Sequence, residues 1–291
     1  MSQLLVVETA RVKPRSRKRG RWARRARFVF ITVFTLFALF PLLTVVLYAF
    51  RPSTALVSGG SQGFSFTLAN FRYVFSQTEM LLFLRNSVIV SCSTALVAVI
   101  VGAPAGYVLS RSRHKLLSIY SVILFVVQGL PVVVFLIPLF LLYVHLGLQN
   151  SLQGVVVAYV AISVPFAIWM MRSYFDSIPV EIEEASWVDG CSVVSAFVRV
   201  ILPNAGPGIL AAAIFSFLVA WNDYIIADVM LRSTSVTTMG IGLESLFTQY
   251  SAAWGAIMAS SLLMMAPPLI VFAIFNRYFS LGGVAGSLGG S

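Results

Sequence analysis

Charged residues are scarce in this 291-residue sequence. They make up 10% of the chain, hydrophobic residues make up 59%, and the mean hydropathy is +0.92. A soluble domain carries about 25% charged residues, so the composition excludes an ordinary water-soluble protein and predicts an integral membrane protein. Because one span needs about 20 apolar residues, the chain has room for about six.

Lysine, histidine and cysteine are also scarce, which excludes several kinds of active site. The lysines are Lys13, Lys18 and Lys115, and none follows a glycine. A phosphate-binding G-x-x-x-x-G-K-[ST] loop is therefore absent, and the chain does not hydrolyse ATP by itself. The cysteines, Cys92 and Cys191, and the two histidines have no metal-ligand spacing. We expect free thiols and no metal, cofactor or catalytic site in this chain.

Long apolar runs predict an all-α fold, because open sheets cannot cross lipid. Six runs have spanning length, at residues 28–50, 86–110, 117–146, 154–171, 208–229 and 254–275. Pro131 and Pro138 interrupt the third run, and we expect them to bend it. The prediction is a six-span domain over residues 28–279, with a basic tail before it (1–27) and a Gly-rich tail after it (280–291).

The basic residues predict the orientation. Ten of the twenty Lys and Arg residues lie in residues 1–27, so the positive-inside rule places both termini in the cytoplasm. The polar segment 177–203 falls on the same side, and the loop at 230–253 falls outside. A basic tail can also bind nucleic acid, but this one directly abuts a span. Attraction to anionic membrane lipid explains it without a nucleic-acid partner.

The segment 177–203 is a polar island in an apolar chain. Glu181, Glu183, Glu184 and Asp189 fall within nine positions of it. Each would cost about 2.5–3.5 kcal/mol at the centre of a bilayer. The island therefore lies in water, where another protein can meet it.

The island has the features of two short helices. Ser177 can cap the first helix, Gly190 can end it, Ser192 can cap the second, and Pro203 can end that one. The first presents a small, mildly apolar face that suits a protein partner, although a merely solvated acidic helix is the alternative: Ile182, Ala185, Ser186 and Asp189. The second presents an apolar stripe that we expect to pack on the spans: Val194, Phe197, Val198 and Ile201.

These residues resemble the EAA loop of ABC importer permeases. The match comprises Glu184-Ala185-Ser186, with Ser186 where a second alanine is usual, then Gly190, then Val200-Ile201-Leu202-Pro203. The resemblance implies that the first helix seats in a cleft of an ATP-binding subunit. The candidate coupling residues are Glu183, Glu184, Ala185, Ser186, Asp189, Gly190, Leu202 and Pro203.

Outside the loop, shorter matches resemble the carbohydrate-uptake branch, and within it the second permease of maltose-type systems. They are residues 66–71, 221–224, 254–256 and 276–279. The resemblance implies a heteromeric complex in a bacterial or archaeal cytoplasmic membrane. Its other members would be a second permease, two ATP-binding cassette subunits that hold ATP and Mg, and an extracytoplasmic solute-binding protein or lipoprotein.

Polar and aromatic residues in the spans are candidates for the substrate path. An ionisable residue at membrane depth is a functional candidate, which singles out Asp223 and its neighbour Asn222. Trp221 and Tyr224 could stack on a sugar, and Gln128 lies in the third span. Shaping an outer gate remains the alternative for Asp223, and ordinary interhelical hydrogen bonding remains the alternative for Gln128.

The basic residues also bear on the solute. Because no Lys or Arg falls in the middle of a predicted span, we expect a neutral sugar or oligosaccharide, carried by alternating access, more than glycerol-3-phosphate or a related phosphodiester. An ion-coupled secondary transporter is the alternative from another class. It would bury more carboxylates than Asp223 and Asp228, the acids of the predicted spans.

Overall fold

The computed structural model describes the backbone of residues 17–52, 65–248 and 254–288 and the side chains of residues 24–52, 65–247 and 254–275. Contacts divide the chain into two units, Met1–Leu47 and Tyr48–Ser291. The first contains most of α1 (Arg17–Ala49), whose candidate span is Arg24–Ala49. Throughout the described ranges every regular element is a helix, as the sequence predicts.

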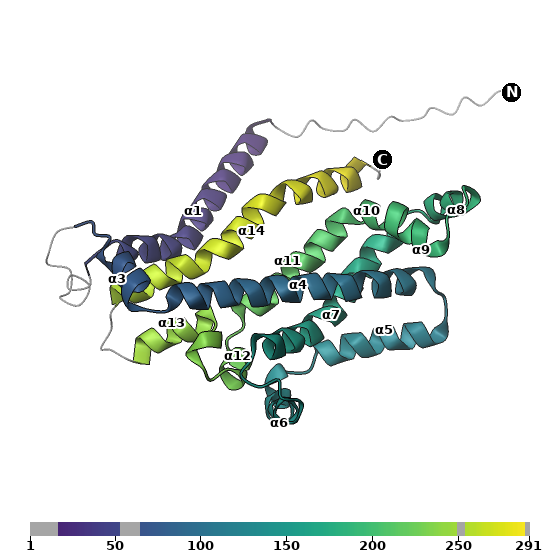
Figure 1. Ribbon diagram of the computed structural model, residues 1–291. Coiled ribbons are helices and arrows are strands. Elements are labelled where there is room, and N and C mark those ends of the chain that lie inside the picture. The colour runs from purple at the N-terminus through teal and green to yellow at the C-terminus, as the bar shows by residue number, and fades with distance from the viewer. Residues whose placement is uncertain (1–16, 53–64, 249–253, 289–291) are drawn as a thin grey trace. The chain divides into compact units, whose positions relative to one another are not determined.

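The second unit carries the remaining helices (Figure 1). They are α3 (Ala69–Gln77), α4 (Met80–Arg111), α5 (Lys115–Gln128), η1 (Val132–Phe135), α6 (Leu136–Leu146), α7 (Leu152–Asp176), α8 (Val180–Val188), α9 (Val193–Ala196), η2 (Phe197–Ile201), α10 (Leu202–Asn204), α11 (Gly206–Asn222), α12 (Ile225–Met230), η3 (Thr234–Val236), α13 (Met239–Thr248) and α14 (Trp254–Leu288).

Four described helices are long and apolar enough to cross a membrane: α4, α7, the Arg24–Ala49 part of α1 and the Trp254–Phe275 part of α14. Two bent pairs raise the number to six if each is one span. The first pair, α5 with η1–α6, bends by 93° at a break that contains Pro131. The second pair, α9–α10 with α11, bends by 77°.

The predicted fifth span differs from the structure. One helix over residues 208–229 was expected, but α11 ends at Asn222 and α12 begins at Ile225. Asp223 and Tyr224 therefore lie in a break between two helices and not within a continuous span. Apolar residues flank the polar pair Asn222-Asp223 on both sides, which is why the predicted span was drawn across the break.

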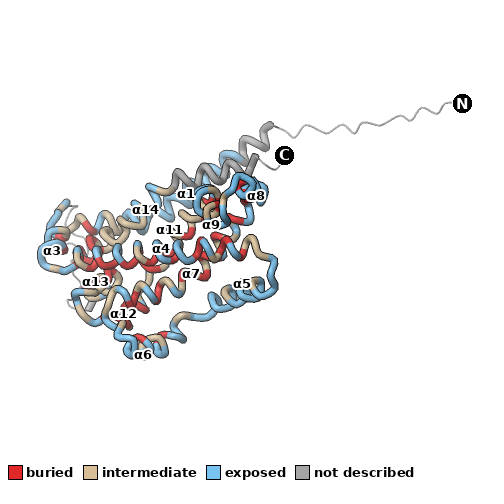
Figure 2. Tube along the Cα trace, turned by 45° about the vertical axis from the view of Figure 1, so that its right-hand side comes forward, coloured by how far each residue is buried: buried red, intermediate tan, exposed pale blue. Residues whose placement is uncertain are grey.

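The core of the second unit is formed by α4, α7 and α11, which contain many of the buried residues (Figure 2). Gly102 and Gly106 lie four positions apart on α4 and bring its backbone close to α7. A Cβ atom at Gly106 would lie 2.8 Å from Met171 Cβ and 2.9 Å from the Arg172 nitrogen. Small residues spaced in this way are typical of close helix packing in membranes.

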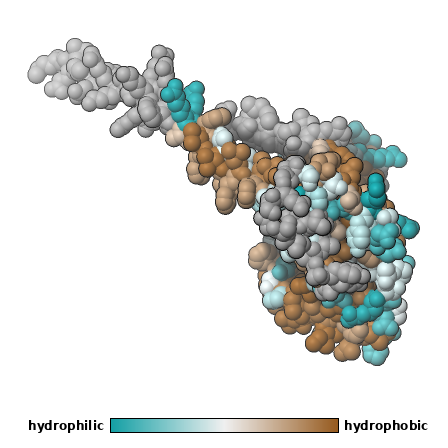
Figure 3. All heavy atoms as spheres, turned by 90° about the vertical axis from the view of Figure 1, so that its left-hand side faces the viewer, coloured by the Kyte–Doolittle hydropathy of each residue, from teal (hydrophilic) through white to brown (hydrophobic). Residues whose placement is uncertain are grey.

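Large apolar side chains also cover much of the outer surface. Phe125 of α5 is 66% exposed and Ile137 of α6 is 75% exposed, and broad apolar areas are visible in Figure 3. A soluble monomer rarely exposes contiguous apolar patches of this extent. Lipid or other membrane subunits must therefore cover this surface.

Candidate coupling site

The two short helices of the island, α8 and α9, lie at one end of α4 (Figure 1). Ser177 does not cap α8 as predicted, because its hydroxyl donates to the Tyr174 carbonyl, 2.6 Å away, in the last turn of α7. Gly190 follows α8 with φ of +88°, the left-handed conformation expected of a stop. Ser192 accepts a hydrogen bond from the Ser195 nitrogen at 3.3 Å, which confirms the predicted cap of α9.

Glu183 of α8 points into the protein. It is 1% exposed, and one carboxylate oxygen lies 2.8 Å from Arg111 Nε at the end of α4. The other oxygen accepts a hydrogen bond from the Tyr107 hydroxyl. A buried carboxylate needs both an opposite charge and hydrogen-bond donors, and α4 supplies both.

Arg111 joins three helices through one guanidinium group. Besides Glu183, it donates to the carbonyl of Phe175 at 3.1 Å and to that of Ile178 at 3.1 Å. The last carbonyls of a helix have no partner within the helix and carry its negative dipole end. Arg111 therefore fastens the end of α7 and the base of α8 to the end of α4.

Aromatic rings surround this ion pair. The Tyr107 ring packs against Phe175 with centroids 5.8 Å apart and against Phe197 of η2 with centroids 4.7 Å apart. Ile201, at the end of η2, is fully buried. The second helix of the island therefore packs on the bundle as predicted, but only through part of its stripe, because Val194 and Val198 are 72% and 51% exposed.

Of the eight candidate coupling residues, five are exposed and three are at least partly buried. Glu184, Ala185, Asp189, Gly190 and Pro203 are exposed. Glu183 is buried, and so is Ser186, whose hydroxyl donates to the Glu183 carbonyl at 2.7 Å. These two residues, together with the half-buried Leu202, were expected at a partner contact, but the structure directs Glu183 and Ser186 toward their own chain.

Pro203 does not end the second helix of the island. The helical segment continues through α10 to Asn204, and Ala205 follows before α11 begins at Gly206. Pro203 lies at the first positions of α10, where the backbone N–H that proline lacks is not required for a hydrogen bond within that helix. The chain therefore turns one step later than the sequence suggests.

The candidate substrate-path residues mostly serve internal contacts. Asp223 accepts hydrogen bonds from the Tyr159 hydroxyl at 2.8 Å and from the Ile226 nitrogen at 3.0 Å, so it caps α12 and ties it to α7. Trp221 is 4% exposed and stacks on Phe217, with centroids 5.6 Å apart. It is therefore not available to stack on a sugar in this conformation.

Two of the other three path candidates are exposed. Gln128 is exposed and donates to the Ile162 carbonyl of α7 at 2.9 Å, which is the interhelical hydrogen bond left open as its alternative. Asn222 is exposed, and Tyr224 is partly exposed in the break before α12.

The opposite end of α4 holds residues 235–239 by neutral hydrogen bonds that the sequence did not reveal. The Asn86 amide donates to the carbonyls of Ser235 and Thr237 at 3.0 and 2.9 Å. The Ser87 hydroxyl accepts from the Met239 nitrogen at 2.7 Å. Asn86 and Ser87 open an apolar run, and this position is the only sequence signal that could have singled them out.

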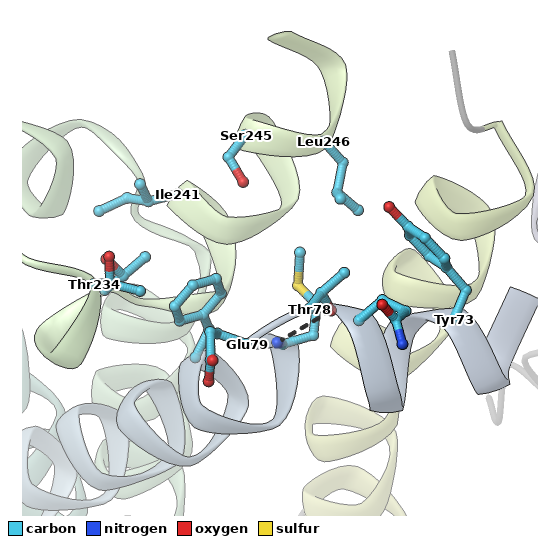
Figure 4. Close-up of a pocket in the computed structure, with 11 residues that line it drawn as sticks. Tyr73, Thr78, Glu79, Thr234, Ile241, Ser245 and Leu246 are labelled. Atoms are coloured by element: carbon cyan, nitrogen blue, oxygen red, sulfur yellow. Dashed lines mark hydrogen bonds between the residues drawn. The ribbon is translucent and has the colours of Figure 1, made fainter. Parts of the chain in front are cut away.

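A pocket of about 370 Å³ lies at this same end (Figure 4). Side chains of α13, among them Ser245 and Leu246, face Tyr73 of α3 and the junction residues Thr78 and Glu79 across it. Segment 230–253 is the predicted outer loop. Within this loop the sequence offers Glu244 and Gln249 as candidate contacts for a binding protein. Glu244 is exposed, and Gln249 lies outside the described residues.

The two ends of α4 are far enough apart to lie on opposite sides of a membrane. At 1.5 Å per residue, Ser87 and Arg111 are separated by about 36 Å along the helix. The hydrocarbon core is about 30 Å thick. The geometry therefore fits an arrangement in which α8 and the 235–239 segment face opposite aqueous compartments.

Comparison with known proteins identifies the family. Residues 98–281 match the model of the binding-protein-dependent transport system inner membrane component. The chain belongs to this family. Because the family and its relatives are ABC transporter permeases, this permease is a transmembrane transport subunit and not an enzyme.

Relatives match the permease over most of its length. It is 31% identical over 274 residues to the arabinooligosaccharides transport system permease protein AraQ of Halalkalibacterium halodurans, covering 92% of this chain and 96% of that one. It is 31% identical over 264 residues to the inner membrane ABC transporter permease protein YcjP of Escherichia coli, covering 89% and 94%. The sulfoquinovosyl glycerol transport system permease protein SmoH of Agrobacterium fabrum is 28% identical over 266 residues, covering 91% and 93%.

Solved structures share the fold of the permease. A chain of a bacterial ABC transporter that imports the acidic polysaccharide alginate superimposes with a TM-score of 0.78 and 20% identity, covering 92% of this chain and all of that one. A chain of the inward-facing MetNI methionine transporter gives a TM-score of 0.58 at 19% identity, covering 68% and 94%. At these identities the likeness concerns the fold alone.

Proposed function

We propose that this permease belongs to an ATP-driven, binding-protein-dependent importer that moves a neutral sugar or oligosaccharide by alternating access. The single observation that carries the coupling mechanism is the two-sided character of α8. Its inner side is fastened to α4 by Arg111, while Glu184, Ala185 and Asp189 remain exposed. A helix that is held on one side and free on the other can receive a force and pass it on.

The exposed side of α8 suits an ATP-binding subunit. Ala185 and Gly190 are small and let a partner backbone come close, and Glu184 and Asp189 offer charge to basic groups. Because the permease has no phosphate loop of its own, the ATP must be bound elsewhere in the complex. The assembly we propose contains a second permease, two ATP-binding cassette subunits with ATP and Mg, and an extracytoplasmic binding protein.

The proposed orientation follows from the two ends of α4. The end with α8 faces the cytoplasm, where ATP is present, and the Asn86 end faces the binding protein outside the cytoplasmic membrane. The basic N-terminal tail supports the same orientation. Closure of the ATPase subunits would then move α8 and tilt the spans between inward-open and outward-open states.

The basic residues support a neutral solute over a phosphate ester. Arg111 is engaged by Glu183, and Arg172 contacts Ser121 Oγ at 3.0 Å and Asp176 at 3.7 Å. Both lie near the ends of their helices. Phosphate binding usually takes an Arg or Lys with donors to spare, and AraQ is named for an oligosaccharide. Glycerol-3-phosphate or a related phosphodiester is the second candidate.

The substrate path we propose is narrower than the sequence suggested. Asn222 is exposed and the half-buried Tyr224 lies in the helix break, so both remain candidates. Asp223 is equally half-buried, but its carboxylate is engaged by Tyr159 and the Ile226 nitrogen. Asp223 and Trp221 would act through them by holding that break in shape.

Charge reversal on the exposed side of α8 tests the coupling role. In the complete complex reconstituted in liposomes, Glu184→Arg is expected to abolish ATP-dependent uptake, either by preventing co-purification of the ATPase subunits or by uncoupling hydrolysis from transport. Glu79→Arg, at the opposite end of α4, is the control and should leave co-purification unchanged. Normal uptake by the Glu184→Arg complex would refute the docking role.

Competition assays test the solute. Uptake of a labelled saccharide should be inhibited by neutral sugars or oligosaccharides and not by phosphate esters. Competition by phosphate esters alone would favour the second candidate. Genes for a second permease and a solute-binding protein beside this gene are expected in either case, and their absence would count against the importer itself.

A further inference from the structure

The contact between Arg111 and Glu183 joins parts of the chain that are 72 residues apart. Glu183 and Glu184 are neighbours in sequence, but successive residues of a helix point about 100° apart. Glu184 is therefore exposed on α8, while Glu183 is buried against α4. The short helix thus has separate surfaces for a partner and for its own bundle.

We propose that the Arg111–Glu183 ion pair is the joint through which movement of α8 is transmitted to α4. Both residues would then be positioning residues for transport, which act through α4 and touch neither ATP nor solute. This inference rests on the proposed function, because it presupposes that a partner subunit moves α8.

Burial gives the ion pair the strength that a joint requires. The Glu183 side chain is 2% exposed and that of Arg111 is 17% exposed. Water reaches Glu183 hardly at all, so separating the two residues would leave the Glu183 carboxylate unpaired in a medium of low polarity. Apolar contacts can slide past one another at much smaller cost. When α8 is displaced, α4 is therefore expected to move with it.

The same guanidinium group prevents α8 from pivoting on its connection to α7. Arg111 holds the carbonyl of Phe175, in the last turn of α7, and the carbonyl of Ile178, within the connection itself. Nearby, the Ser110 hydroxyl donates to Asp176 Oδ1 at 2.6 Å. The ends of α4 and α7 and the base of α8 are thereby held as one body, and close packing at Gly106 extends this body into the membrane.

The opposite end of α4 shows where a movement passed through the joint would arrive. α4 is one helix of 32 residues, and its first turns hold the 235–239 segment through Asn86 and Ser87. A continuous helix fixed at both ends can carry a displacement from one side of the membrane to the other. The joint would therefore link ATPase movement to the segment that faces the binding protein.

Neutralising Glu183 in the reconstituted complex tests the joint. Glu183→Gln keeps the shape of the side chain and an acceptor for Tyr107 but removes the charge that pairs with Arg111. The readout is the number of solute molecules transported per ATP hydrolysed, together with co-purification of the ATPase subunits. We expect the number of solute molecules transported per ATP to fall about fivefold or more, because coupled sites typically affect one another by at least that factor. Co-purification should be normal. Glu181→Gln, on the same helix but exposed, should match the wild type.

Two further variants separate transmission from simple loss of folding. Tyr107→Phe removes only the hydroxyl that donates to Glu183. Its ratio of solute transported to ATP hydrolysed should lie between that of Glu183→Gln and that of the Glu181→Gln control. The double variant Arg111→Gln with Glu183→Gln should be no worse than Arg111→Gln alone, because both changes break the same ion pair and Arg111→Gln already loses the contacts with the Phe175 and Ile178 carbonyls. Losses that multiply in the double variant would overturn the proposal.

The remaining outcomes are also decisive. A wild-type transport ratio in Glu183→Gln would overturn the joint. A parallel fall of uptake, hydrolysis and amount of complex in both Glu183→Gln and Tyr107→Phe would do the same, because it would show a purely structural role. If Glu184→Arg uncouples transport while Glu183→Gln does not, the proposed function stands and only this inference fails. If the wild-type complex shows no ATP-dependent uptake, the proposed function itself fails.

Discussion

The two ends of α4 are fastened by different chemistry. At the Arg111 end, a buried ion pair and a guanidinium shared among three helices hold α8. At the Asn86 end, a neutral amide and the Ser87 hydroxyl hold the backbone of residues 235–239. Both ends hold a segment that is distant in sequence, but only one uses charge.

This difference teaches how each end can respond to force. Separation of a buried ion pair leaves an unpaired charge, so the Arg111 end favours joint movement over sliding. Neutral hydrogen bonds to backbone are each worth about 1 kcal/mol net, so the Asn86 end can release and reform its segment more readily. The charged end suits the transmission of movement, and the neutral end suits a segment that adapts to a partner.

Removal of the guanidinium should give the largest effect. Arg111→Ala leaves Glu183 buried without its counter-charge, which is expected to destabilise the permease by about 3–5 kcal/mol. Thermal unfolding of the purified complex, followed by helical circular dichroism, measures the loss. Arg113→Ala, in the exposed loop that follows, is the matched control. Equal stability of the two variants would show that the charged end is no stronger than the surface.

Overpacking beside the charged end should give the next effect. Gly106→Ala introduces a methyl group 2.9 Å from the Arg172 backbone nitrogen. Because backbone atoms cannot move aside as side chains can, we expect destabilisation of about 3 kcal/mol, at the upper end for overpacking. Gly206→Ala, where a Cβ atom meets nothing within 4 Å, is the control. A harmless Gly106→Ala would mean that α4 and α7 are free to separate there.

Truncation at the neutral end should have a smaller and more local effect. Asn86→Ala removes two hydrogen bonds to the backbone, at a cost of about 2 kcal/mol. Hydrogen–deuterium exchange should rise at residues 233–239 and stay unchanged at residues 177–190. Gln153→Ala, an exposed amide at the start of α7, should alter neither segment. Faster exchange in both segments would break the distinction between the two ends.

The smallest effect is expected at the helix break near the neutral end. Tyr159→Phe removes one hydrogen bond to Asp223, worth about 1 kcal/mol, while the Asp223 carboxylate still caps α12 by accepting from the Ile226 nitrogen. The unfolding temperature of the complex should fall slightly. Tyr143→Phe, which removes the hydroxyl of a buried tyrosine of α6, is the variant with which this fall is compared. A loss as large as that of Arg111→Ala would place a charged joint at this end as well.

The helical class and the main apolar elements could be predicted because both depend on local composition. Runs such as 86–110 and 154–171 lie inside α4 and α7, since an apolar stretch of that length has few alternatives to a helix in lipid. The polar island could be found for the same reason. The end of α8 at Gly190 and the cap at Ser192 were likewise encoded within a few residues.

The candidate sites were harder to predict because neighbouring residues of one type have different surroundings. Glu183 and Glu184 look alike in sequence, and only packing against α4 shows that the first is buried. Trp221 was a candidate for stacking on sugar, but Phe217 on the preceding turn already covers it. Asp223 was placed within a span, yet its carboxylate caps the next helix.

By itself, the sequence determined that this chain is a helical membrane protein with one exposed acidic island, because hydropathy and charge are properties of individual residues. Only the tertiary structure decided which glutamate is paired, which end of α4 holds the ion pair and which helices are fastened together. Those choices depend on contacts between residues far apart in the chain, such as Arg111 and Glu183, and no local pattern records them.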